Sequence, residues 1–255
     1  MGRLLGLPRA AAQRWRWSRS RRRPGRIRLT VRQWTIVVVF AVTSAVVAVG
    51  AGLPHTPSKV PAAAVVRARA ALSALPVLGR RPPHDSSYDR DAFGPAWTDD
   101  AAVRGGGNAC DTRNDILARD LVVSARTGTS SCPSAVASGT LTSPYTGRTI
   151  GFQRGRGSAA VQIDHIVPLS YAWDLGASRW PAPRRWSFAN DPANLVAVDG
   201  ASNQAKSDAE PARWMPPLRA FHCQYAVQFV AVLTAYGLPI DVPSRDILGA
   251  VLRSC

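Results

Sequence analysis

Three polar residues stand where they could hold a metal ion and activate water. Asp164 and His165 are neighbours at the end of a short apolar run, and Asn203 lies on a later segment. An aspartate beside a histidine can place a hard metal ion and a general base about one side chain apart, and the amide of Asn203 adds a second oxygen ligand. This spacing favours metal-assisted attack of water on a phosphate ester.

Asn194 and Lys206 extend the pattern, and each has two interpretations. Asn194 either braces a hairpin through backbone hydrogen bonds or takes part in catalysis. Lys206 follows Asn203 by three residues and shares its helix face. It either contacts phosphate or offsets developing charge, or it is an ordinary solvated lysine. The Asp164-His165 pair alone could simply end a strand, but the complete set argues against that.

Two strands are expected to carry the first residues of the set. Residues 161–164 alternate apolar and polar side chains, which predicts a strand. Pro168 argues against a helix just beyond this strand. Residues 194–198 predict the returning strand.

A helix is expected next, because Asp199-Gly200 turns the chain. Asp199 or Ser202 can cap a helix that runs from about residue 201 to residue 209. The predicted order is therefore strand, strand, helix.

These motifs resemble the HNH endonuclease family, in the version whose last position is Asn rather than His. The resemblance is carried by Asp164-His165-Ile166-Val167-Pro168, Asn194-Leu195, Asn203 and Lys206. The spacing from Asn194 onward is also similar to the HNH domain of RNA-guided CRISPR nucleases. Four further segments resemble exported HNH-family proteins of actinobacteria, namely 88–97, 110–117, 143–147 and 212–217.

The expected fold is α+β, with a ββα-metal finger embedded in a mainly helical single domain at 65–255 and a catalytic core at about 140–215. Asp164 and Asn203 would hold one Mg²⁺, or Mn²⁺, and His165 would be the general base with a pKa near neutral. The resemblance implies products with 5′-phosphate and 3′-hydroxyl ends. DNA is favoured over RNA as the substrate, with weak sequence specificity because no base-reading module is visible.

The N-terminal residues predict where this chemistry happens. Residues 1–33 contain eleven arginines and no acid, and residues 34–53 contain no charge. At ~1.5 Å per residue the uncharged run can span a bilayer core of ~30 Å as a helix. The positive-inside rule then places everything after it outside the cytoplasm. The run either remains as a membrane anchor or is a signal segment cut near its small residues, and residues 54–64 read as a Pro/Ala linker.

The net charge of +16 is mainly a property of this N-terminal segment. Without its arginines, the rest of the chain has 21 basic and 16 acidic residues. Two arginine clusters flank the motif and either bind a phosphate backbone or are solvated surface; they are Arg148, Arg154 and Arg156, and Arg179, Arg184 and Arg185.

Four cysteines agree with an oxidising compartment. They form no CxxC pair that would suit zinc, so disulfides are the better interpretation, and a catalytic cysteine is less favoured. Three pairings are possible, and the simplest joins Cys110 to Cys132 and Cys223 to Cys255.

Other expected elements frame the catalytic unit. Residues 65–78 predict a helix ended by Pro82-Pro83, and residues 115–124 predict another, capped by Asp111 or Thr112. Residues 140–152 predict two short strands around a turn. Four tryptophans either stack bases or belong to the core; they are Trp173, Trp180, Trp186 and Trp214.

The sequence therefore predicts a metal-dependent endonuclease that acts outside the cytoplasmic membrane. One alternative is a nuclease effector against competitors or phage, and another is a wall-proximal binding protein whose catalysis has lapsed. No protein partner is predictable. His55, His84 and His222 carry no partner pattern and receive no role.

Overall fold

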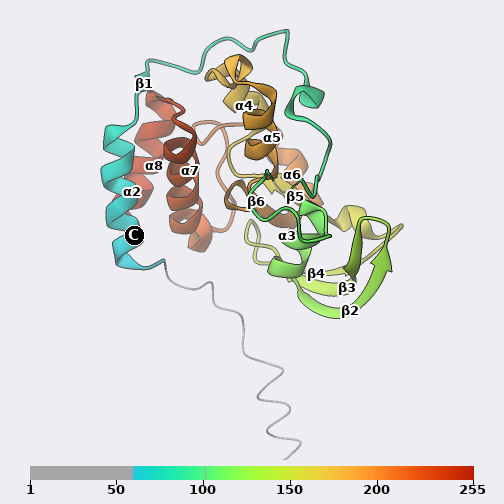
Figure 1. Cartoon of the computed structure of the whole chain (residues 1–255). Coiled ribbons are helices and arrows are strands. Elements are labelled where there is room, and N and C mark those ends of the chain that lie inside the picture. Colours follow the sequence, from blue (N-terminus) through green and yellow to red (C-terminus); the bar gives the residue numbers. More distant parts are fainter. Residues whose placement is uncertain (1–59, 101) are drawn as a thin grey trace, which may run out of the picture. The chain divides into compact units, whose positions relative to one another are not determined.

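The computed structural model describes residues 60–100 and 102–255 of the chain. Contacts divide the chain after Pro54, and the described residues belong to the second unit, His55–Cys255. Figure 1 shows that this unit combines helices with small sheets. The arginine-rich segment 1–33 and the expected membrane helix 34–53 lie outside the described residues. No helix within the described ranges is both long and apolar enough to cross a bilayer.

Three helices pack together on one side of the unit (Figure 1): α2 (Ala62–Ala74), α7 (His222–Tyr236) and α8 (Val242–Ser254). The short strands β1 (Val77–Leu78) and β7 (Ile240–Asp241) pair in parallel beside them. These helices contribute much of the larger hydrophobic core, which holds a buried aromatic group around Tyr225.

Helix α2 differs from its prediction at both ends. It begins inside the expected linker 54–64, with its first turn at Ala62, and ends at Ala74 rather than near Pro82. Pro76 explains the early end, because a proline disfavours the helical conformation in the residue before it. Leu75 accordingly has extended backbone angles.

Helix α3 (Thr112–Asp120) and a three-stranded antiparallel sheet form a second layer. The sheet has the order β2 (Val122–Thr129), β3 (Cys132–Thr142) and β4 (Thr149–Gln153). The expected cap is confirmed, since Asp111 accepts a hydrogen bond from the Asn114 amide at 2.8 Å. The expected extension of this helix to residue 124 is wrong, because the β-branched pair Val122-Val123 starts β2 instead. The expected turn between β3 and β4 is confirmed.

The residues of the sequence motif lie on a two-stranded antiparallel hairpin, β5 (Val161–His165) and β6 (Leu195–Asp199), and on the helix α6 (Gly200–Lys206) that follows it. The predicted order of strand, strand and helix is therefore confirmed. Asp199 caps α6 by accepting a hydrogen bond from the Ser202 amide at 2.9 Å. The helix ends at Lys206, three residues before the expected end.

The connection between β5 and β6 contains α4 (Leu169–Asp174) and α5 (Ala182–Asn190). Helix α4 starts directly after Pro168, so the expectation that this proline excludes a helix there is wrong. Proline is tolerated at the start of a helix because the first amides have no partner within the helix. Short 3-10 turns complete the described chain: η1 (Arg90–Phe93), η2 (Ser158–Ala160), η3 (Ala177–Arg179), η4 (Pro192–Asn194) and η5 (Arg219–Phe221).

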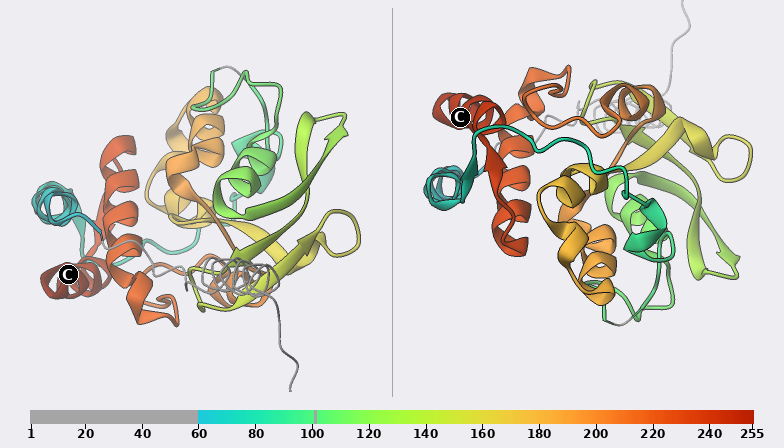
Figure 2. Two further views of the ribbon diagram at one scale, coloured as in Figure 1. Left: turned by 90° about the horizontal axis from the view of Figure 1, so that it is seen from below. Right: turned by 90° about the horizontal axis from the view of Figure 1, so that it is seen from above.

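Strand β6 is buried on both faces. Leu195 and Ala197 pack into the smaller core with α3 and the three-stranded sheet, whereas Val196 and Val198 pack into the larger helical core. This alternation follows from the two-residue period of a strand. The hairpin therefore packs into both cores, between the group of α2, α7 and α8 and the three-stranded sheet, which lie on opposite sides of the unit in Figure 2.

Both disulfides of the simplest pairing are present, Cys110–Cys132 and Cys223–Cys255, and no cysteine is free. The tryptophans mostly follow the core interpretation. Trp173 is buried, and Trp180 and Trp214 pack against the larger core.

Candidate active site

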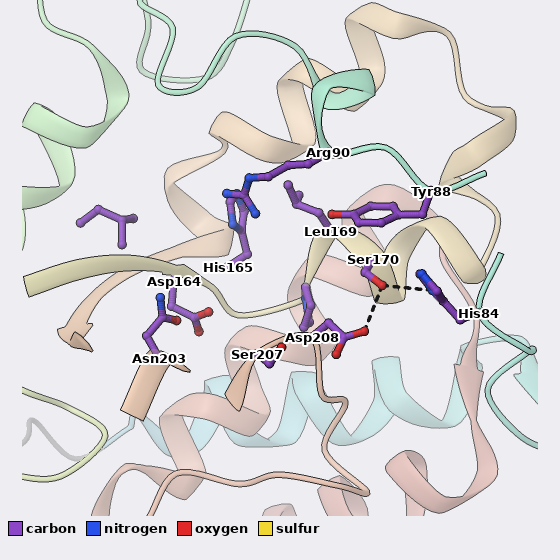
Figure 3. A pocket seen from close by; sticks show the side chains of 12 residues that line it. His84, Tyr88, Arg90, Asp164, His165, Leu169, Ser170, Asn203, Ser207 and Asp208 are labelled. Carbon is purple, nitrogen blue, oxygen red and sulfur yellow. Dashed lines mark hydrogen bonds between the residues drawn. The ribbon is translucent and has the colours of Figure 1, made fainter. Parts of the chain in front are cut away.

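A cavity of about 440 Å³ lies at the end of β5 (Figure 3) and brings together Asp164, His165 and Asn203. Asp164 and His165 come from the strand, and Asn203 comes from α6. The residues expected to hold a metal and to act as a base therefore share one open site. Asn194 and Lys206 do not line it.

Asp164 presents one carboxylate oxygen to the cavity. Its Oδ2 accepts hydrogen bonds from the hydroxyl of Tyr145 and from Nζ of Lys206, the latter at 2.6 Å. Among the described residues, no side chain or backbone group bonds to Oδ1. One oxygen is therefore used to hold the side chain, and the other remains free as a ligand.

Lys206 is completely buried, so it is neither an ordinary solvated lysine nor a direct phosphate contact. Helix α6 packs on β5 and directs the lysine inward, where Nζ donates to Asp164 and to the backbone oxygen of His165 at 2.5 Å. Burial lowers the pKa of the amine, and the charge of Asp164 opposes this shift. Lys206 is therefore neither solvated nor able to contact a phosphate in the cavity. It compensates the charge of Asp164 from the buried side of the carboxylate.

The amide of Asn203 is oriented by Gln162, a neighbour on β5. Nδ2 of Asn203 donates to Oε1 of Gln162 at 2.8 Å. Since this bond engages the nitrogen, the carbonyl oxygen remains available to a cation. The described residues contain no cluster of three or more His, Cys, Asp or Glu side chains that could hold a metal ion.

His165 is fixed by two contacts. Its Nε2 lies 2.8 Å from the carbonyl oxygen of Ala189, and the ring of Trp97 stacks on it with centroids 6.0 Å apart. Because a carbonyl only accepts hydrogen bonds, Nε2 carries the proton and Nδ1 keeps its lone pair. Burial lowers the pKa of His165 to about 3, with the charges of Arg90 and Lys206 acting in the same direction. The expected pKa near neutral is therefore wrong, and the imidazole is neutral at pH 7.

Asn194 has the bracing role and not the catalytic one. Its Oδ1 accepts from the amide of Val167 at 2.8 Å, its Nδ2 donates to the oxygen of the same residue at 3.2 Å, and its own backbone oxygen accepts from Ile166 at 2.8 Å. The side chain is fully buried. It fixes the chain just beyond His165 and cannot touch a substrate, which corrects its expected place among the catalytic residues.

The two arginine clusters are partly structural. Arg154 donates to the oxygen of Val136 at 2.8 Å, and Arg184 donates to the oxygen of Tyr236 at 2.6 Å. These bonds tie segments of the fold together. None of the six clustered arginines lines the cavity.

Sequence reasoning missed the opposite wall of the cavity, which consists of His84, Tyr88, Arg90, Ser170 and Asp208. Three of these come from the segment before α3. The only sequence signal for these wall residues was the resemblance of 88–97 to exported HNH-family proteins, and this resemblance does not indicate that the segment lies beside the cavity.

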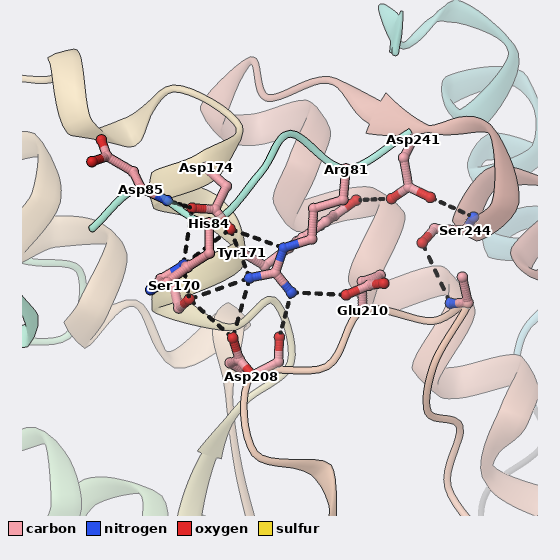
Figure 4. Close-up of polar contacts among 11 residues, drawn as sticks. Arg81, His84, Asp85, Ser170, Tyr171, Asp174, Asp208, Glu210, Asp241 and Ser244 are labelled. Atoms are coloured by element: carbon pink, nitrogen blue, oxygen red, sulfur yellow. Dashed lines mark hydrogen bonds and ion pairs between the residues drawn. The ribbon is translucent and has the colours of Figure 1, made fainter. Parts of the chain in front are cut away.

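Arg81 holds this wall in place (Figure 4). Its guanidinium lies 2.7 Å from Asp174, 2.8 Å from Glu210 and 3.2 Å from Asp208. Asp174 also contacts His84 at 3.3 Å. The segment before α3 is therefore attached to α4 and to the chain after α6.

Comparisons with known proteins identify the family of this chain. Residues 111–240 match the family model described as GmrSD restriction endonucleases, C-terminal domain. A protein of Arthroderma benhamiae described as an uncharacterized secreted protein is 37% identical over 222 residues, which cover 86% of this chain and 98% of the relative. No solved structure matches. The matched region contains Asp164, His165 and Asn203, and the chain belongs to the family of the C-terminal domain of GmrSD restriction endonucleases, a family of nucleases.

Proposed function

We propose that this protein is a metal-dependent HNH endonuclease that hydrolyses phosphodiester bonds of nucleic acid, with DNA favoured over RNA. One observation carries the proposal. A free oxygen of Asp164, a free amide oxygen of Asn203 and a histidine with an unprotonated Nδ1 belong to residues that line the same cavity.

The hairpin β5–β6 and helix α6 would then be a ββα-metal finger. The register His165↔Leu195 ends the hairpin beside the cavity, and α6 begins directly after β6. The two hydrophobic cores pack against this unit from both sides. Such support suits a site whose groups must be placed within a fraction of an ångström.

The oxygens of Asp164 and Asn203 fit a hard cation such as Mg²⁺ or Mn²⁺. Mg²⁺ is commonly bound through one or two carboxylates, with waters and substrate phosphates as further ligands, so two protein ligands suffice. When bound, the cation would neutralise charge that develops on the phosphate. Lys206 and Tyr145 keep Asp164 in place from the buried side.

His165 would accept the proton of the attacking water at Nδ1. The hydrogen bond between Nε2 and Ala189 keeps the proton on the other nitrogen, and the stacked ring of Trp97 restricts rotation. As the imidazole becomes charged, the carbonyl of Ala189 stabilises it. A lapsed binding protein has less support, because the groups needed for hydrolysis remain together.

We place this activity outside the cytoplasmic membrane, with residues 34–53 as an anchor or a cleaved signal. The two disulfides suit an oxidising compartment. The relative from Arthroderma benhamiae is described as secreted.

The test is the conversion of supercoiled plasmid by the purified chain, with Mg²⁺, with Mn²⁺ and with EDTA, beside the same assay on a structured RNA. Nicked and linear plasmid in metal and none in EDTA is the expected result. An intact plasmid and intact RNA in both metals would refute the proposal.

A further inference from the structure

Arg90 is a cation of the cavity that the proposed mechanism does not use. Among the described residues that line the cavity, it is the single arginine or lysine. It also lines a smaller adjoining hollow of about 60 Å³, together with Trp97 and His165. Figure 3 shows its guanidinium next to the ring of His165, and its charge lowers the pKa of that ring.

The charge of Arg90 has no partner among the described carboxylates. No ion pair joins it to an acidic side chain, and the residue is exposed. Arg81, only nine positions earlier, contacts three carboxylates and is largely covered. The fold therefore uses Arg81 to hold the wall, whereas Arg90 lies beside the hydroxyl of Tyr88 and its charge is paired with no described carboxylate.

The backbone that carries Arg90 is fixed. Arg185 of α5 donates to the oxygen of Ala92 at 2.8 Å. Gly94 has φ +83°, and a Cβ there would lie 2.4 Å from the ring of Trp186, so only glycine allows this close approach. Arg90 therefore extends over the cavity from an anchored turn, which reduces the entropy lost when it binds.

We propose that Arg90 binds the phosphate of the nucleic-acid substrate on the His165 side of the cavity. The proposal rests on the proposed function and adds the phosphate contact that the fully buried Lys206 cannot make. A guanidinium suits this role because its planar donors match two phosphate oxygens at once. Arg90 lies before the family match at 111–240, so the segment in front of the matched region would supply part of the substrate site.

The test measures affinity for a fluorescent DNA duplex by anisotropy, in Mg²⁺ and at several salt concentrations. All proteins carry His165→Ala, so that the duplex stays intact. Arg90→Ala is expected to weaken binding about 10-fold or more, the range for a lost charged hydrogen bond, and to reduce the salt slope by about 0.9. Arg90→Lys should keep the slope and lose part of the affinity.

Arg67→Ala is the matched control, because Arg67 is an exposed arginine on α2 and does not line the cavity. Equal affinity and equal salt slope for Arg90→Ala and Arg67→Ala would overturn the inference. If Arg90→Ala is unstable in thermal unfolding, the affinities and salt slopes of Arg90→Gln and Arg90→Lys are compared instead, because these two variants differ mainly in charge. Equal values for the two would overturn the inference. Failure of the otherwise unmodified chain to cleave any nucleic acid would instead refute the proposed function.

Discussion

Lys206 and Asp164 form a buried ion pair at the back of the candidate active site, with Nζ 2.6 Å from Oδ2. The lysine side chain has no exposed surface, and the hydroxyl of Tyr145 contacts the same oxygen. The pair directs the second oxygen of Asp164 toward the cavity. The ion pair offsets the cost of burying the negative charge of Asp164, so the carboxylate stays ionised beside the cavity, where it could bind a cation.

Replacing Lys206 by methionine is expected to destabilise the fold. Removal of one partner leaves the carboxylate of Asp164 buried with only the hydroxyl of Tyr145, a change that costs about 3–5 kcal/mol in comparable pairs. The free energy of unfolding in urea measures it. Adding Asp164→Leu should recover part of the loss, because no buried charge remains. A Lys206→Met variant with normal stability and weak DNA binding would contradict the structural role.

Replacing His165 by alanine is expected to lower cleavage by at least ~100-fold while DNA binding persists, the usual loss for a general base. Single-turnover cleavage and anisotropy measure the two properties. His222→Ala is the control, because His222 also lies beside a backbone carbonyl, that of Pro216 at 2.7 Å, but does not line the cavity. Normal turnover by His165→Ala would remove the base from the mechanism.

Asn203→Ala is expected to raise the Mg²⁺ concentration needed for half-maximal cleavage, because one of two oxygen ligands is lost. Gln162→Ala should have a smaller effect of about 10-fold, since it only frees the amide of Asn203 to rotate. Calorimetric titration with Mg²⁺ gives a second measurement. Gln204→Ala, on the exposed side of α6, serves as control. Full activity in EDTA would show that no metal takes part.

The Cys223–Cys255 bridge joins α7 to the last residue across 32 positions. Its removal by the double change to serine should lower the free energy of unfolding by about 3–4 kcal/mol in the chain-entropy model. Thermal unfolding measures the loss, and cleavage by the folded fraction should be unchanged because neither cysteine lines the cavity. Unchanged stability would show that the bridge does not constrain the unfolded chain.

We expect the C-terminal part of the chain to lie outside the cytoplasmic membrane. A reporter enzyme that is active only outside the membrane should therefore work when fused after Cys255, and one that is active only in the cytoplasm should not. The arginines of 1–33 should stay in the cytoplasm because their translocation is costly. Protease added to cells without their wall should also degrade the catalytic domain. A reporter active only in the cytoplasm would favour an intracellular role and would remove the export argument.

Much of the local structure was predictable from the sequence, because it depends on neighbours along the chain. The alternation in 161–164 and 194–198 predicts the hairpin, and Asp199 predicts the start of α6. The spacing of Asp164, His165 and Asn203 predicts the shared site. These predictions need only periodicity, capping chemistry and the family likeness.

Tertiary packing alone decided how the remaining groups are used. Helical periodicity states that Asn203 and Lys206 share a face, but the packing of α6 on β5 buries the lysine and leaves the asparagine at the cavity. Arg90 and His165 are 75 positions apart in the chain but line the same hollow, which no local pattern records. Burial also lowers the pKa of His165, and this burial involves Trp97 and Ala189, which come from distant segments of the chain. Local sequence thus determines which residues can do chemistry, and long-range packing determines which of them are exposed to a substrate, because solvent exclusion depends on all segments that meet at one place.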